Sequence, residues 1–213
     1  MPEVKVFGIG LNKTGTTTLA RALRALGYST VHGGTAQAGE TDVYAAVERA
    51  VREGSHPFAH VPELDDVDAF FDVRAVERFY PQLDEAYPGS RFILHTRALE
   101  PWLASRQQHV EHNVASKARG AYSGDWLTVD LDAWTRMWTE HHQRVRTYFG
   151  DRPDDLLEID VTNGQGWEVL TPFLGCAQPA EPFPWANKGR GEKVSIRLRR
   201  AASQRLRHGL RDS

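Results

Sequence analysis

The fold is decided by the segment Phe7-Gly8-Ile9-Gly10-Leu11-Asn12-Lys13-Thr14-Gly15-Thr16-Thr17-Thr18-Leu19, near the start of the 213-residue chain. Apolar residues alternate around Val6 before it, and leucines recur at helical spacing from Leu19 to Leu26 after it. A glycine-rich turn between a strand and a helix can bind an anion through backbone N–H groups and the helix N-terminus. Lys13 adds a positive charge, so a phosphate or a related group is the expected ligand.

This turn departs from the ATP-binding pattern. That pattern reads G-x-x-x-x-G-K-[ST], and Asn12 stands where its second glycine belongs. The remaining Lys-Thr-Gly-Thr-Thr resembles the phosphosulfate loop of sulfotransferases, which use 3′-phosphoadenosine 5′-phosphosulfate (PAPS). The resemblance implies that the donor is bound by Lys13, Thr14, Gly15, Thr16, Thr17 and Thr18.

A second segment carries an independent resemblance. Arg91–Arg97 reads as a buried strand with a polar tip, and the stretch from Pro101 to Ser105 opens a helix, with proline near its first turn. In sulfotransferases an arginine at this strand end and a serine eight positions later hold the 3′-phosphate of PAPS. Arg97 and Ser105 have that spacing, and an arginine fork matches phosphate oxygens in a bidentate way.

A third resemblance lies near the C-terminus, in the stretch from Pro182 to Gly191. It is similar to the Pro-Phe-Pro-x-x-Asn segment of bacterial sulfotransferases and, in part, to a loop that closes over the 3′-phosphate in cytosolic ones. The match implies donor contacts for Lys188 and Arg190. A basic loop without a ligand explains the same residues, and both readings stay open.

Alternating strand and helix patterns run along the rest of the chain. We expect strands at 29–32, 69–73, 91–96 and 156–160 beside the first one, and helices at 41–53, 81–88, 101–112, 130–149 and 166–174. This alternation predicts an α/β, three-layer, P-loop-like fold, with a central parallel sheet of about five strands and helices on both faces. Ligands bind such sheets at the carboxyl ends of the strands, where Lys13, His32, Asp72 and Arg97 fall.

Length and composition favour one catalytic domain over residues 1–213. The apolar fraction of 40% supports a sizeable core, and the lone cysteine, Cys176, suits a reducing compartment. We expect a cytoplasmic protein without a signal peptide or a membrane span. The segment 109–135, with Tyr122 and Trp126, matches no motif and is expected to form a lid over the acceptor.

Charge is concentrated in the C-terminal segment 188–213. It contains nine Lys or Arg and two Asp or Glu, a net charge of +7, so the rest of the chain carries −9. A basic amphipathic helix of this kind can bind nucleic acid, a membrane or a partner protein. We favour a final helix packed on the domain with a solvated basic face, and expect no nucleic-acid partner.

Sulfuryl transfer requires charge neutralisation on the leaving oxygen and a base for the acceptor's proton. Lys13 is the candidate for the first role, and the resemblance gives the loop lysine that role; no metal is required. The Lys-x-His pair that supplies the base in cytosolic sulfotransferases is absent, so Asp72 is the first candidate for the base. His32 and His60 are alternates. A further departure is Thr18, where cytosolic sulfotransferases carry a tryptophan that stacks on adenine.

Three other interpretations account for parts of the sequence. A small-molecule kinase using Mg-ATP would read Asp72 as the acidic residue after a Walker B strand and Thr14 as a Mg²⁺ ligand. A non-catalytic nucleotide-binding protein would use the basic segment to hold nucleic acid. Histidine pairs at 109 and 112 or at 141 and 142 lack partners at metal-ligand spacing, so no metal site is expected. The acceptor is expected to be a hydroxyl or amine of a small molecule or glycan, and the sequence does not identify it. The oligomeric state is also open, and a homodimer is one possibility.

Overall fold

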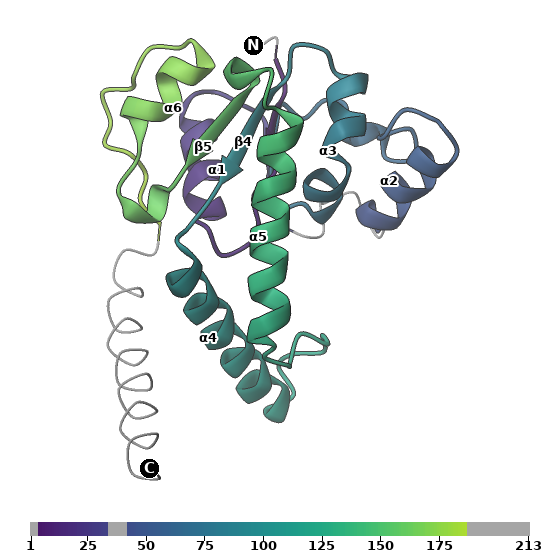
Figure 1. Ribbon diagram of the computed structural model, residues 1–213, viewed down its shortest axis with the longest axis vertical. Coiled ribbons are helices and arrows are strands. Elements are labelled where there is room, and N and C mark those ends of the chain that lie inside the picture. Colours follow the sequence, from purple (N-terminus) through teal and green to yellow (C-terminus); the bar gives the residue numbers. More distant parts are fainter. Residues whose placement is uncertain (1–3, 34–41, 187–213) are drawn as a thin grey trace, which may run out of the picture. The chain divides into compact units, whose positions relative to one another are not determined.

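The computed structural model describes residues 4–33 and 42–186 (Figure 1). Its strands are β1 (Val6–Gly8), β2 (Thr30–His32), β3 (Ala69–Phe71), β4 (Arg91–His95) and β5 (Leu156–Ile159). Its α-helices are α1 (Thr16–Ala25), α2 (Val43–Arg52), α3 (Arg74–Ala86), α4 (Leu99–Ala118), α5 (Leu131–Tyr148) and α6 (Trp167–Leu174). Short 3-10 helices occupy Pro62–Leu64, Pro153–Asp155 and Val161–Asn163.

The five strands form one parallel sheet in the order β2-β3-β1-β4-β5. The central strand β1 places Phe7 opposite Phe70 of β3 and Phe92 of β4. His32 at the end of β2 pairs in register with Phe71 of β3, so Asp72 follows directly beyond this pair. The carboxyl ends of β1, β2 and β3 therefore meet at one edge, as the alternating pattern predicts.

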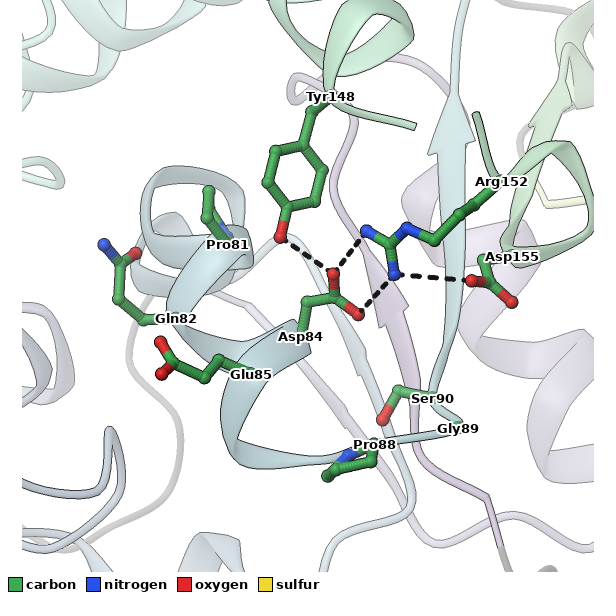
Figure 2. Close-up of a pocket in the computed structure, with 10 residues that line it drawn as sticks. All are labelled: Pro81, Gln82, Asp84, Glu85, Pro88, Gly89, Ser90, Tyr148, Arg152 and Asp155. Atoms are coloured by element: carbon green, nitrogen blue, oxygen red, sulfur yellow. Dashed lines mark hydrogen bonds and ion pairs between the residues drawn. The ribbon is translucent and has the colours of Figure 1, made fainter. Parts of the chain in front are cut away.

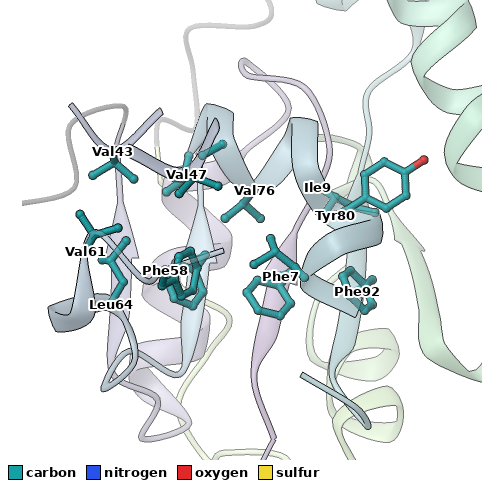
Figure 3. Packing of buried hydrophobic residues seen from close by; sticks show 14 of the residues in the cluster. Phe7, Ile9, Val43, Val47, Phe58, Val61, Leu64, Val76, Tyr80 and Phe92 are labelled. Carbon is teal, nitrogen blue, oxygen red and sulfur yellow. The ribbon is translucent and has the colours of Figure 1, made fainter. Parts of the chain in front are cut away.

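The two faces of the sheet carry separate apolar layers. On one face, Phe7, Phe70 and Phe92 pack with residues of α2, α3 and the C-terminal part of α5 (Figure 3). On the other face, Val6 and Ile93 pack with residues of α1 and α6. Successive residues of a strand point to opposite faces, which is why both layers draw on the same short strands. The α/β architecture with helices on both faces is confirmed.

Two expected helix bounds were wrong. α3 begins at Arg74 rather than Pro81, and Phe79 has non-helical dihedral angles (φ −108°, ψ 26°) just before the proline. Proline lacks the N–H of an interior helical residue and clashes with the preceding turn, so the helix passes it through a kink instead of starting there. α4 continues beyond His112 to Ala118, where Gly120 follows with φ 70°.

Among the described residues the chain divides into two compact units. The first contains the sheet and comprises the residues up to Arg97 together with His141–Ala186; the second comprises Ala98–Glu140. The helix α5 contributes residues to both units, and each unit is described here by itself. A search of the described ranges finds no helix that is both long and apolar enough to cross a membrane.

Candidate active site

The glycine-rich turn joins β1 to α1 and leaves the helix N-terminus open. Gly15 is the N-cap residue of α1, with φ 93°, and among the described residues no side chain caps this helix end. Lys13 also adopts a left-handed conformation, with φ 67°. Consecutive left-handed and helical residues turn successive N–H groups toward one point, so this turn is suited to bind an anion.

Two glycines in the turn are required by space. A Cβ on Gly10 would clash with the backbone carbonyl of His95, and one on Gly15 would clash with Val161. Gly15 additionally has a positive φ, which disfavours any side chain. The loop therefore lies directly on β4 and on the segment after β5, and its path is fixed by close backbone packing.

The Thr14 side chain faces the protein interior. It is fully buried, its hydroxyl donates to the carbonyl of Leu11 at 2.5 Å, and Oγ1 lies 2.7 Å from Nδ1 of His95. Thr14 can therefore contact a ligand through its backbone N–H, while its hydroxyl closes the loop from within.

The other threonines begin α1. His32 Nε2 lies 3.1 Å from Thr16 Oγ1 and 3.5 Å from Thr17 Oγ1, so the tip of β2 meets the first turn of the helix. Thr18 Oγ1 accepts a hydrogen bond of 3.1 Å from the backbone N–H of Ala186. This bond brings the C-terminal segment that resembles bacterial sulfotransferases to the start of α1.

Asp72 occupies a strained position at the end of β3. Its φ of 59° lies in the left-handed region, which is uncommon for a residue other than glycine. Such residues cluster at functional sites. Burial raises the pKa of its carboxyl group, while the charges of His32 and Lys13 act in the opposite direction. Within residues 4–33 and 42–186 its carboxylate accepts no hydrogen bond and forms no ion pair. Asp72, His32 and Lys13 thus lie within electrostatic reach of one another.

His32 is less suited to act as a base in this arrangement. Burial lowers the pKa of its ring, although the charge of Asp72 raises it, and a lower pKa makes the ring a weaker base. Its Nε2 is engaged with the threonine hydroxyls of α1. His60 lies after α2, where Nε2 is within hydrogen-bonding distance, 2.8 Å, of Glu53 Oε2. Of the three candidates, only the half-buried Asp72 carboxylate is without a hydrogen bond among the described residues.

Arg97 lies just after β4 and reaches the glycine-rich turn. Its Nη1 donates to the carbonyl of Lys13 at 3.4 Å, a long bond that connects the two motifs. Burial lowers the pKa of its guanidinium, and Asp160 raises it. An arginine stays charged at any physiological pH, so a half-buried guanidinium here presents a positive charge beside the loop.

Three further donor contacts were predicted from the sequence. Ser105 lies on α4 in the second unit. Lys188 and Arg190, with the whole basic segment 188–213, lie outside the described residues. These three contacts stay predictions.

The expected lid belongs to the second unit. Residues 109–118 are the C-terminal half of α4, and the segment 119–130 leads to α5. Within this unit the Arg106 guanidinium lies 4.6–4.8 Å from the ring centres of Trp102, Trp126 and Trp134. Asn113 Nδ2 donates to the carbonyl of Trp126 at 3.0 Å. Trp126 thereby anchors the segment 119–130 to α4.

Two residues near the loop were not identified from the sequence. His95 and His141 were not assigned to the site, although His141 falls on the apolar stripe of α5, seven residues after Trp134 and four before Val145. That spacing was the signal that its ring is buried. His141 and His142 do not form a metal pair: Nε2 of His141 lies 2.6 Å from the carbonyl of Ile9, and Nε2 of His142 lies 2.7 Å from Thr96 Oγ1.

No group of three or more histidine, cysteine or acidic side chains gathers at metal-binding distance in the part of the chain that the structure describes.

A pocket of about 570 Å³ lies at the opposite edge of the sheet, beside the amino ends of β4 and β5 (Figure 2). In it Asp84 accepts hydrogen bonds from Tyr148 and Arg152, which joins α3 to the end of α5. It lies at the amino ends of the strands, whereas ligands of parallel sheets bind at the carboxyl ends, where the glycine-rich turn lies.

The fold and the glycine-rich turn define a sulfotransferase-like protein, and comparison with known families agrees. The chain matches the family described as "Sulfotransferase domain" over residues 5–128 and 116–191, most of its length, so it belongs to that family. Among curated proteins it is similar to the "Ava biosynthesis cluster protein M" of Aspergillus versicolor. The two are 26% identical over 212 residues, an alignment that covers 85% of this chain and 80% of the relative.

Proposed function

We propose that this sulfotransferase takes its sulfuryl group from PAPS and transfers it to a hydroxyl or amine of a small molecule or glycan. The observation that carries the proposal is the uncapped N-terminus of α1 behind the left-handed residues Lys13 and Gly15, with Arg97 bonded to the same turn. This arrangement presents backbone N–H groups and two cations to one anionic ligand.

The chemistry of these residues fits the donor. The turn with Lys13 and the N–H groups of Thr16 and Thr17 would hold the 5′-phosphosulfate, and Arg97 would hold the 3′-phosphate. When bound, PAPS supplies an activated sulfuryl group on a phosphate leaving group. The donor's two anionic ends require two separate cationic positions, and the strand ends of β1 and β4 each provide one.

Lys13 and Asp72 would divide the chemical work. Lys13 would neutralise charge that develops on the bridging oxygen, where a fixed cation stabilises the transition state more than the ground state. Asp72 would accept the proton of the acceptor's hydroxyl, and its burial supports this because a raised pKa makes a carboxylate a stronger base. His32 would orient the first threonines of α1 rather than remove the proton.

Trp185 is our candidate for the aromatic partner of the adenine. Thr18 replaces the tryptophan that stacks on adenine in cytosolic sulfotransferases, and the bond from Ala186 to Thr18 draws the neighbouring Trp185 toward that position. Trp185 is partly exposed and packs edge-on against Phe183, which in turn packs against Trp167. Packing of Trp167 on Phe183 and of Phe183 on Trp185 would hold the Trp185 indole rigidly enough to stack on the adenine.

The Mg-ATP kinase interpretation has less support. It assigns the Thr14 hydroxyl to Mg²⁺, but that hydroxyl donates to Leu11 and contacts His95 in the interior. The Aspergillus relative is named for a biosynthesis cluster, which favours a biosynthetic small molecule as the acceptor. A cytoplasmic location, favoured by the single Cys176, remains part of the proposal.

The test is turnover. The purified protein is incubated with PAPS and a panel of phenols, alcohols, amines and sugars in EDTA, and release of 3′,5′-adenosine bisphosphate (PAP) is followed. We expect acceptor-dependent PAP release that is lost in Lys13→Ala. PAP release that requires Mg²⁺, or phosphorylation of an acceptor from ATP in place of sulfation, would contradict the proposal.

A further inference from the structure

Two buried histidines contact the glycine-rich turn from the protein interior. His141, from α5, is 3% exposed, and its Nε2 lies 2.6 Å from the carbonyl of Ile9. A carbonyl only accepts, so Nε2 of His141 carries the hydrogen and donates it. Its other nitrogen, Nδ1, lies 3.1 Å from Nη2 of Arg144, which always donates. This pair of partners fixes His141 as a neutral ring with one defined tautomer.

His95, from β4, lies under the next part of the turn. Its side chain is fully buried, and Nδ1 is 2.7 Å from Oγ1 of Thr14. Thr14 has a single hydroxyl hydrogen and gives it to the carbonyl of Leu11, so Nδ1 of His95 donates to Thr14. His95 therefore orients the hydroxyl that holds the Leu11 carbonyl.

These contacts answer a requirement of any anion-binding turn. When the N–H groups of a turn point outward to a ligand, carbonyls of the same turn point inward, where water does not reach them. A buried carbonyl without a donor is destabilising, so the inward carbonyls need donors from the protein. His141 serves the carbonyl of Ile9, and His95 serves that of Leu11 through Thr14.

We propose that His95 and His141 are positioning residues, which hold the inward carbonyls of the turn so that its N–H groups face the donor. The proposal rests on the proposed function for the identity of the ligand, but not for the geometry of the empty turn. Burial holds both rings neutral: the pKa of His95 is lowered to about 3 and that of His141 to about 4. The groups near His95 are His141, His142 and the carbonyl of Gly8. The groups near His141 are His142, Arg144 and the carbonyl of Ile9.

The experiment compares four proteins in the absence and in the presence of PAP. His141→Leu removes the donor to Ile9 at similar volume, and His141→Gln restores an N–H near the position of Nε2. Thr171→Val is the matched control, because it removes a buried hydroxyl that donates to the carbonyl of Trp167 within α6. The fourth is the unaltered chain. Hydrogen exchange of the peptide 9–19 is measured against that of α2, and PAP affinity is measured by calorimetry.

We expect His141→Leu to accelerate exchange in the peptide 9–19 relative to α2 and to weaken PAP binding about tenfold or more. His141→Gln is expected to restore both quantities, and Thr171→Val to change exchange in α6 alone. Unchanged exchange in the peptide 9–19 of His141→Leu would overturn the proposal, as would a failure of His141→Gln to restore it. If His141→Leu does not fold, His95→Asn and His95→Leu form the same pair at the second position. If the unaltered chain does not bind PAP, the exchange result still decides the proposal, and only the proposed function fails.

Discussion

Thr14 Oγ1 lies 2.7 Å from Nδ1 of His95, across 81 positions of sequence, and at the same time donates its hydrogen to the carbonyl of Leu11. The hydroxyl that would bind Mg²⁺ in an ATP-type loop is thus used to close the turn from inside. This contact helps to distinguish a Mg-ATP site from a metal-free sulfuryl-donor site, which the sequence motif alone does not do. It favours a donor that is bound by backbone N–H groups and cations, without a metal held by Thr14.

The first prediction concerns this hydroxyl. Thr14→Val keeps the volume but removes the donor to Leu11 and the partner of His95, so we expect the free energy of unfolding to fall by about 1–3 kcal/mol. Urea denaturation followed by tryptophan fluorescence measures the loss. Thr14→Ser retains the hydroxyl and is expected to keep most of the stability. Equal stability of Thr14→Val and the unaltered chain would contradict the hydrogen bonds described above.

Asp72 carries the second prediction. Asp72→Asn removes the proposed base without changing size, and we expect kcat to fall about 10²–10⁴-fold while PAP affinity stays within a factor of about two. Steady-state kinetics and calorimetry give the two quantities. His32→Gln keeps a polar group against the threonines of α1 and is expected to lose far less. If His32→Gln abolishes turnover and Asp72→Asn does not, the base is the histidine.

The third prediction is a pH dependence of stability. His95 and His141 have folded pKa values of about 3 and about 4, below the ordinary value near 6.5. Their stabilisation is therefore fully present above pH 6.5 and is lost as pH falls toward these folded values. Burial lowers the pKa of His32 in the same direction, whereas the raised pKa of Asp72 acts oppositely above its ordinary value.

Between pH 6 and pH 4 the two histidines bind protons in the unfolded chain but stay neutral in the folded protein. Each should therefore lower the free energy of unfolding by up to about 1.4 kcal/mol per pH unit, about 2.7 kcal/mol for both. Thermal unfolding at half-unit steps of pH measures the slope. Nitrogen NMR of both rings checks the cause, because their signals should not titrate between pH 8 and pH 5. Titration of either ring near pH 6.5 would contradict its buried, neutral state.

Asp84 supplies a prediction away from the turn. Its pKa is low because, although burial raises it, the hydrogen bonds from Arg152 and Tyr148 lower it. Asp84→Asn weakens the connection between α3 and α5, so we expect a fall in unfolding temperature but PAP affinity and turnover within a factor of about two of the unaltered chain. Loss of PAP binding in Asp84→Asn would place function at the pocket of Figure 2 instead of the glycine-rich turn.

Much of the fold followed from local patterns. The alternation of apolar strands and helical stripes predicts the parallel sheet, and the glycine-rich segment predicts a turn between the first strand and the first helix. The start of α3 did not follow, because Pro81 reads as a helix start while the packing of Val76 and Tyr80 extends the helix through a kink. Tertiary packing outweighed the local signal there.

The site was predictable only in part, for a similar reason. The strand ends that carry Lys13, Asp72 and Arg97 follow from the parallel sheet. Thr14 and its partner His95 are 81 positions apart in the sequence, and His141 and Ile9 are 132 positions apart. No local sequence pattern encodes such contacts. A histidine on an apolar helical stripe indicates burial, but not which carbonyl it serves.

The most direct test of the account is binding of PAP in EDTA, compared with ATP and ADP in Mg²⁺, measured by thermal shift of the purified chain. We predict that PAP at 100 times its dissociation constant stabilises the protein by about 2.7 kcal/mol without metal, and that Arg97→Ala loses this effect. Stabilisation by Mg-ATP alone, with none by PAP, would contradict the account and would make Asp72 a metal ligand instead of a base.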